Sequence, residues 1–402
     1  MPETNIFDRR GIPTVINAAG TLTRLSGGIV APGVAEAMRD ASFASVDMLE
    51  LQAHASQVLA AITGAEAGYV TAGASAGLLL ATAACLSRYD ASLMNRLPDT
   101  GGMSNEFVIP RGHRNGYDHA VRAAGGRLVE AGLPERQAGV GVRETEAWEI
   151  GAAINERTAA VLYVAGEWAR PALAEVTEIA HRASVPVIVD AAAELPPQSN
   201  LRHFLAQGAD LVVFSGGKAL GGPAASGILC GRRNLVMSAV VQSIDLDVTW
   251  DQWNPPTALV DKKSLTGLPQ QGVGRSCKVG KQEIMGLLAA IEHFVAEGDE
   301  ARHSRWLVDA RRIADGLADQ DAATVTLVGE NDVSCIPRVE LQFPRGSTSA
   351  ALALAERLLD GDRPIHLDQT WSDRGRLIVN PICLRDGEAR LVAQNVVRIL
   401  RQ

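Results

Sequence analysis

Two apolar stretches that each end in a charged residue decide how this chain is expected to fold: VPVIVD at residues 185–190 and DLVVFSGGK at residues 210–218. Uninterrupted apolar runs of this length are typical of parallel strands buried on both faces. Asp190 and Lys218 close the two runs, and a charged side chain at the end of a buried strand needs a partner. Ligands of open α/β sheets bind beyond the carboxyl ends of the strands, so we expect both residues to face a bound molecule.

The segment from about residue 60 to residue 235 alternates between strand and helix patterns. This alternation predicts an α/β fold with a mainly parallel, seven-stranded sheet that is covered by helices on both faces. The last strand follows a short glycine-rich link, which predicts that it runs antiparallel to its neighbour. The expected strands are 67–71, 106–110, 127–130, 160–164, 185–190, 210–215 and 226–230.

The rest of the chain predicts a second, smaller domain. Residues 240–274 contain tryptophans, prolines and glycines and are expected to form an irregular connection. A long helix should begin near Lys281 and reach about Leu317, with a break near Gly298, before a small α+β domain. With 402 residues, two domains are the natural expectation. We place a large ligand-binding domain, including an N-terminal active-site segment, at 1–250, and the connection, long helix and small domain at 251–402.

Composition narrows the classes of partner and the compartment. The formal net charge is −8 and there is no basic tract, so nucleic acid is not expected as a partner. The most apolar window is too short to span a membrane, and residues 1–10 contain no apolar signal core, which favours the cytoplasm. The five cysteines are widely spaced, indicating neither a disulfide framework nor a zinc site.

Four segments carry a resemblance to a known family: VINAAGT at 15–21, YVTAGASAG at 69–77, VDAA at 189–192 and FSGGK at 214–218. In their order and spacing, the chain resembles fold-type-I pyridoxal-phosphate (PLP) enzymes of the selenocysteine-synthase-like branch. It is most similar to the subgroup of D-glucosaminate-6-phosphate ammonia-lyase-like proteins, which lack a tRNA-binding extension. The resemblance implies a PLP-dependent transferase fold, PLP as the cofactor, and a homodimer or higher homo-oligomer with active sites at the subunit interface.

The resemblance gives Lys218 and Asp190 specific roles. Lys218 would form a Schiff base with the PLP aldehyde and, once released by substrate, would move protons. Asp190 would keep the pyridine nitrogen protonated, so that the ring accepts the charge of a substrate carbanion. The competing interpretations are a snorkelling surface lysine and an aspartate that serves as a helix cap or ion-pair partner.

Further residues are candidates for holding the cofactor. Ala74 and Ser75 lie between a strand and a helix, where small residues and a helix N-terminus favour a phosphate. Ser215 is a second candidate for a phosphate contact, although turn hydrogen bonding would also explain a serine there. His113 lies in the loop that usually supplies the side chain stacked on the cofactor ring, and we assign it that role against the alternative of a solvated loop. The spacing of His113 and His119 does not indicate a metal site.

Substrate contacts are assigned to three more regions of the chain. The N-terminal segment and the loop after the strand expected at 160–164 should lie near the active site, and the stretch before the long helix offers an arginine for a carboxylate or phosphate. Ordinary turns and a surface helix-entry patch are the competing interpretations. The substrate candidates are Asn17, Thr21, Thr23, Glu167, Arg170 and Arg275.

These residues predict an enzyme that acts at the α-carbon of an amino acid. The nearest subgroup favours β-elimination, as by a dehydratase or ammonia-lyase, from a β-hydroxy or sugar-derived amino acid. Racemisation or epimerisation and aldol cleavage use the same lysine and cofactor, and they remain alternatives. A tRNA-dependent selenium transferase and a non-catalytic binding protein are the more distant alternatives.

Overall fold

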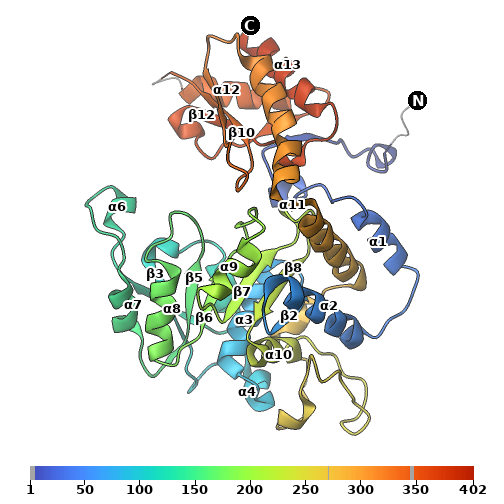
Figure 1. Cartoon of the computed structure of the whole chain (residues 1–402), viewed down its shortest axis with the longest axis vertical. Coiled ribbons are helices and arrows are strands. Elements are labelled where there is room, and N and C mark those ends of the chain that lie inside the picture. The colour runs from blue at the N-terminus through green and yellow to red at the C-terminus, as the bar shows by residue number, and fades with distance from the viewer. Residues whose placement is uncertain (1–4, 270, 345–347) are drawn as a thin grey trace. The chain divides into compact units, whose positions relative to one another are not determined.

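The computed structural model describes residues 5–269, 271–344 and 348–402 and divides the chain into two compact units (Figure 1). The larger unit consists of residues 30–195 and 199–293. The smaller unit consists of residues 1–29, 196–198 and 294–402. These units follow from contacts within the chain, and the domain boundary expected after residue 250 stays a prediction. None of the helices in the described residues is long and apolar enough to cross a membrane.

A seven-stranded sheet forms the centre of the larger unit, as the sequence predicts. Its order is β2-β8-β7-β6-β5-β3-β4. All pairs are parallel except those of β8, which runs antiparallel to β2 and β7. The strands are β2 (Ala67–Thr71), β3 (Glu106–Pro110), β4 (Arg127–Ala131), β5 (Thr158–Val164), β6 (Val187–Asp190), β7 (Leu211–Ser215) and β8 (Gly227–Gly231).

Helices cover both faces of this sheet. Val213 and Phe214 are neighbours on β7, so their side chains point to opposite faces. Gly77 of α3 lies so close to Val213 that a Cβ on the glycine would be 2.8 Å from a Val213 methyl, and Phe204 of α9 meets Phe214 at 6.2 Å between ring centroids. The helices of this unit are α1 (Val34–Ala41), α2 (Met48–Thr63), α3 (Ala74–Ser87), α4 (Ala91–Arg96), α5 (Asp118–Ala123), α6 (Glu135–Ala138), α7 (Ala147–Ala153), α8 (Leu173–Arg182), α9 (Asn200–Ala206) and α10 (Arg233–Val241).

The smaller unit contains a three-stranded antiparallel sheet, ordered β12-β10-β9, and a parallel pair formed by β1 and β11. Its strands are β1 (Ile16–Ala18), β9 (Thr324–Val328), β10 (Arg338–Gln342), β11 (Ile365–Leu367) and β12 (Arg376–Val379), and its helices are α12 (Thr348–Leu359) and α13 (Glu388–Leu400). Their apolar faces share one core, which includes Leu341, Leu354 and Val392.

Helix α11 (Lys281–Leu317) runs from the larger unit into the smaller one, with the expected interruption at Gly298. Gly298 has φ 73° and ψ 166°, which is not helical and which a residue with a Cβ rarely adopts. Glycine at this position therefore allows two helical segments to meet at an angle within one continuous stretch.

Candidate active site

The carboxyl edge of the large sheet brings Asp190 and Lys218 together. Asp190 is the last residue of β6, and Lys218 lies in the turn that follows β7. The strands are in register, with Asp190 opposite Val213, and the Ala191 amide continues the ladder by donating to Val213 O at 2.9 Å. The central residues of both strands are fully buried, so packing holds their ends in place.

Burial and mutual attraction act on both groups. Burial is the largest influence on the Asp190 carboxyl and raises its pKa, while the Ala192 amide and the Lys218 charge act in the opposite direction. Burial likewise lowers the pKa of the Lys218 amine, against the charges of Asp190 and then Glu194. A lowered pKa leaves more of the amine unprotonated, and the unprotonated amine is the nucleophile that reacts with an aldehyde.

Glu194 is a third member of this cluster that the sequence analysis did not identify. It follows β6 in a turn, where its amide donates to Ala191 O at 3.1 Å and its carbonyl accepts from Asn200 Nδ2 at 2.7 Å. Burial raises the pKa of its carboxyl; Lys218 lowers it, and Asp190 and Glu167 raise it. The available signal was an acid four residues after Asp190, on the same loop at the carboxyl edge.

The turn that carries Lys218 is built on two glycines. A Cβ on Gly216 would lie 2.2 Å from Ser226 Oγ, and one on Gly217 would lie 2.5 Å from Ala224 Cα. These glycines let the turn pack against residues 224–226 more closely than a residue with a side chain would permit. Ser215, at the end of β7, is half-buried beside them.

Ala74 and Ser75, the residues expected to contact a phosphate, lie in the first turn of α3. Gly73 precedes the helix with φ 96°, and a Cβ on Gly227 of β8 would lie 2.8 Å from the Ala74 nitrogen. Glycines at both positions leave the first turn of the helix with an uncrowded backbone. Ser75 is exposed and Ala74 is half-buried, and the first amides of a helix have no partner within the helix. A phosphate contact at these residues stays a prediction.

His113 is held by backbone groups on both sides of its ring. Its Nδ1 accepts from the Val164 amide at 3.2 Å, which leaves Nε2 as the protonated nitrogen that donates to Arg170 O at 3.1 Å. The ring is 1% exposed and contacts Tyr163 and Trp168 edge-to-face. Burial lowers the pKa of His113 to about 4, so the imidazole is neutral near pH 7. This environment favours a positioning role over proton transfer; the stacking role stays a prediction.

The loop after β5 contains two of the substrate candidates. Glu167 is exposed and acts electrostatically on Glu194, which associates it with the acidic cluster. Arg170 donates from Nη1 to the carbonyls of Glu167 at 3.0 Å and Ala169 at 2.8 Å. The arginine therefore closes its own loop and has other N–H groups left for a ligand.

The remaining candidates lie apart from this cluster in the chain. Asn17 belongs to the smaller unit and is 8% exposed; its amide donates to Gly20 O and its oxygen accepts from the Ala19 amide, so it stabilises its own turn. Thr21 is half-buried and Thr23 is exposed. Arg275, in the larger unit, forms an ion pair with Asp245 at 2.6 Å. Substrate roles for these residues stay predictions.

A mainly parallel sheet with this order, an acid at the end of β6 and a lysine after β7 define the fold-type-I class of PLP-dependent enzymes. The solved structure of a D-glucosaminate-6-phosphate ammonia-lyase matches with a TM-score of 0.78 and 27% identity, covering 99% of each chain. The chain belongs to the SelA family, described as L-seryl-tRNA selenium transferase, whose model matches residues 33–246. The resemblance and the fold predicted from the sequence are thus confirmed.

Three curated relatives show the range of names within this family. The 5'-C-glycyluridine monooxygenase-decarboxylase of a Streptomyces species is 33% identical, covering 96% of this chain and 90% of that protein. The D-glucosaminate-6-phosphate ammonia lyase of Salmonella typhimurium is 34% identical, covering 72% and 70%. An L-seryl-tRNA(Sec) selenium transferase of Solidesulfovibrio magneticus is more distant, at 25% identity. The prediction of an enzyme in the PLP-dependent lyase class is confirmed.

Proposed function

We propose that this protein is a cytoplasmic, PLP-dependent enzyme that eliminates a β-substituent from an amino acid with a sugar-derived or β-hydroxy side chain. The observation that carries the proposal is the cluster at the carboxyl edge, where Asp190 and Glu194 act electrostatically on the half-buried amine of Lys218. The name of the Salmonella relative, an ammonia lyase acting on an amino-sugar acid, supports both the reaction and the substrate class. We also propose a homodimer or higher homo-oligomer, because most soluble oligomers consist of identical subunits and two-fold dimers are the commonest of them.

The residues at this edge fit PLP in their donor chemistry. The Asp190 carboxylate accepts one hydrogen bond within the described residues, from the Ala192 amide at 3.1 Å, and this leaves capacity for a protonated ring nitrogen. Lys218 supplies the amine for the aldehyde, and the first turn of α3 at Ala74 and Ser75, together with Ser215, supplies donors for the phosphate. When bound, PLP supplies an electron sink for the charge that develops at the substrate α-carbon.

Lys218 and Glu194 would carry out the two proton transfers that elimination requires. The Lys218 amine, with its lowered pKa, would take the α-proton, because an amine whose pKa lies nearer neutrality is an effective general base. The Glu194 carboxyl, whose pKa is raised, would donate a proton to the departing β-hydroxyl. The neutral His113 would hold the loop after β5 through Arg170 O and the end of β5 through the Val164 amide.

A second reaction on the same substrate class is favoured by one observation. The Streptomyces relative matches across nearly the whole of both chains, and its name combines a glycyl-bearing nucleoside with oxygenation and decarboxylation. Both relatives are therefore named for an amino acid joined to a sugar-derived carbon chain. Oxidative decarboxylation at the α-carbon is the alternative outcome of the same substrate contacts.

Product analysis separates the two reactions. The protein, reconstituted with PLP, is incubated with D-glucosaminate-6-phosphate, 5'-C-glycyluridine, serine and threonine, with and without oxygen. Elimination predicts equal yields of ammonia and a 2-keto acid, independent of oxygen. Oxygen-dependent release of carbon dioxide would refute elimination and would support oxidative decarboxylation. Aldehyde release or inversion of configuration alone would instead establish aldol cleavage or racemisation.

A further inference from the structure

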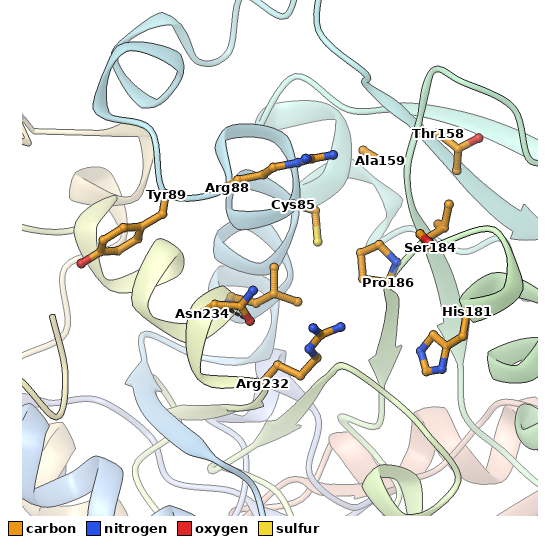
Figure 2. A pocket seen from close by; sticks show the side chains of 12 residues that line it. Cys85, Arg88, Tyr89, Thr158, Ala159, His181, Ser184, Pro186, Arg232 and Asn234 are labelled. Carbon is orange, nitrogen blue, oxygen red and sulfur yellow. Dashed lines mark hydrogen bonds between the residues drawn. The ribbon is translucent and has the colours of Figure 1, made fainter. Parts of the chain in front are cut away.

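A cavity of about 530 Å³ opens at the edge of the sheet opposite to Lys218 (Figure 2). Its walls include the first residues of β5 and the residues just before β6. The C-terminal end of α3 and the segment that joins β8 to α10 form the rest of the lining. β6 and β7 run away from this edge toward Asp190 and Ser215. The cavity is therefore separate from the candidate active site, although the same strands reach both.

Two arginines and a histidine line this cavity, and the arginines differ in their partners. Arg232 Nη1 contacts Asp210 Oδ1 at 3.0 Å, and His181 Nε2 contacts Asp210 Oδ2 at 2.8 Å. The Val187 amide also donates to Asp210 Oδ2, at 2.8 Å, so both oxygens of this buried carboxylate have donors. Arg88 is exposed and has no side-chain hydrogen bond or ion pair anywhere in the described ranges. No described carboxylate therefore pairs with its guanidinium group.

The other lining residues add neutral donors and apolar surface. Ser184 and Asn234 add a hydroxyl and an amide to the lining, and Cys85, Pro186 and Leu235 supply apolar contacts. No aspartate or glutamate is among the described residues that line the cavity. Figure 2 shows the side chains of Arg88 and Arg232 reaching toward this space from α3 and from the end of β8. Because Asp210 pairs with Arg232, the unpaired guanidinium of Arg88 is what gives this cavity its positive charge, in a chain whose formal charge is −8.

The backbone at this cavity is also unusual. Among the described residues, three that are not glycine have positive φ, and two of them, Arg88 at 54° and Ser184 at 58°, line this cavity. Arg88 follows the last residue of α3, a position where glycine avoids the conformational cost. The presence of a long cationic side chain at such a position points to a role for the side chain itself.

We propose that this cavity binds a small organic anion through a phosphate or carboxylate group held between Arg88 and Arg232. Guanidinium groups present forked donors that match either anion, and Arg88 has all of its donors available. The apolar surface formed by Cys85, Pro186 and Leu235 would contact the uncharged part of the ligand. The volume of the cavity is in the range of sites for small metabolites.

The test is a calorimetric titration of inorganic phosphate and, separately, acetate into the PLP-loaded protein at constant ionic strength. PLP occupies the other candidate phosphate site, at the start of α3, and constant salt removes general screening effects. We expect saturable binding of at least one probe, weakened tenfold or more by Arg88→Gln. Arg390→Gln removes an exposed arginine on α13 and should leave the affinity unchanged. Stronger binding of phosphate than of acetate, or the reverse, identifies the head group.

The side chain of Arg88 makes no hydrogen bond or ion pair within the described residues, and Gln keeps the backbone bond to Ala84 O, so Arg88→Gln should keep the wild-type circular dichroism spectrum and melting temperature. Crystals soaked in the tighter probe should show it between the two guanidinium groups. The proposal is overturned if neither probe binds saturably, or if Arg88→Gln binds as tightly as the wild type, since the anion would then sit elsewhere. These outcomes do not depend on the reaction proposed for Lys218.

Discussion

A buried aspartate lies at each edge of the strand pair β6–β7, and the two carboxylates have different surroundings. Asp210, just before β7, is 2% exposed and accepts from Val187, His181 and Arg232. Asp190, at the end of β6, is 7% exposed and accepts from the Ala192 amide alone within the described chain. A buried carboxylate with a complete set of donors stabilises the fold, whereas one left short of donors is available to a ligand. The contrast therefore separates a structural acid from a functional one.

The largest effect expected at the carboxyl edge is that of removing the amine. Lys218→Ala should lower kcat on the order of 10³-fold or more, because the variant loses both the cofactor linkage and the base. The fold should persist, since the side chain is only half-buried. Steady-state kinetics with the substrate found by product analysis would measure the loss. Lys263→Ala, at an exposed lysine, is the control; equal activity of the two variants would remove Lys218 from the mechanism.

Exchanging each acid for its amide compares the two edges directly. Asp190→Asn should lower kcat about 10²-fold without lowering unfolding stability, since the amide keeps the Ala192 contact. Asp210→Asn should cost about 1–3 kcal/mol of unfolding free energy, because it weakens three hydrogen bonds to a buried group, and should leave kcat nearly unchanged. Urea denaturation and kinetics on both variants measure these four quantities. The reverse pattern would refute the comparison.

The pH dependence of stability should also differ between wild type and Asp190→Asn. The pKa of Asp190 is raised on folding, so the folded apoprotein binds a proton more tightly than the unfolded chain. This contribution is fully present below pH 3.8, the ordinary pKa of an aspartate side chain, and is lost as pH rises through the higher folded pKa. Relative to wild type, apo Asp190→Asn should gain stability as the pH rises from about 4 to neutrality. Denaturation at several pH values tests this; a constant difference would contradict it.

The smallest effect concerns Glu194. Its charge raises the pKa of Lys218, so Glu194→Gln should lower that pKa further. The apoprotein should then bind PLP at its maximal rate at a lower pH than the wild type, because only the unprotonated amine reacts with the aldehyde. Stopped-flow absorbance measures the rate, and Glu36→Gln, on the exposed side of α1, is the matched control. An unshifted profile would remove Glu194 from the cluster.

Most strands of the large sheet were predictable because they are apolar runs bounded by turn residues; β4 is the exception, since its sequence RLVEA includes two exposed charged residues. β2 and β3 match the expected ranges, and β8 runs antiparallel as its short link predicts. The pairing of β1 with β11 was not predictable, since it joins three-residue strands almost 350 positions apart. Local sequence patterns do not show which distant segments will pair, because such pairs form only in the folded structure.

The candidate site was predictable where a side chain ends or closely follows a buried strand, and less so elsewhere in the loops. Asp190 and Lys218 follow from the two apolar runs that precede them, because the carboxyl ends of neighbouring parallel strands share one edge of the sheet. Glu194 lies in the turn after β6, and no periodic pattern in the sequence predicts the path of that turn. The ring of His113 was expected in this region, but its two backbone partners, from residues 164 and 170, emerge only from the tertiary structure.

The central claim is that the amine of Lys218 holds the cofactor, with Asp190 beside it. The most direct measurement is borohydride reduction of the PLP-reconstituted protein, followed by proteolysis and mass spectrometry. The account predicts that the mass of the reduced cofactor is found on Lys218, in wild type and in Asp210→Asn alike. A label on another lysine, or no label in a protein that had been saturated with PLP, would contradict it.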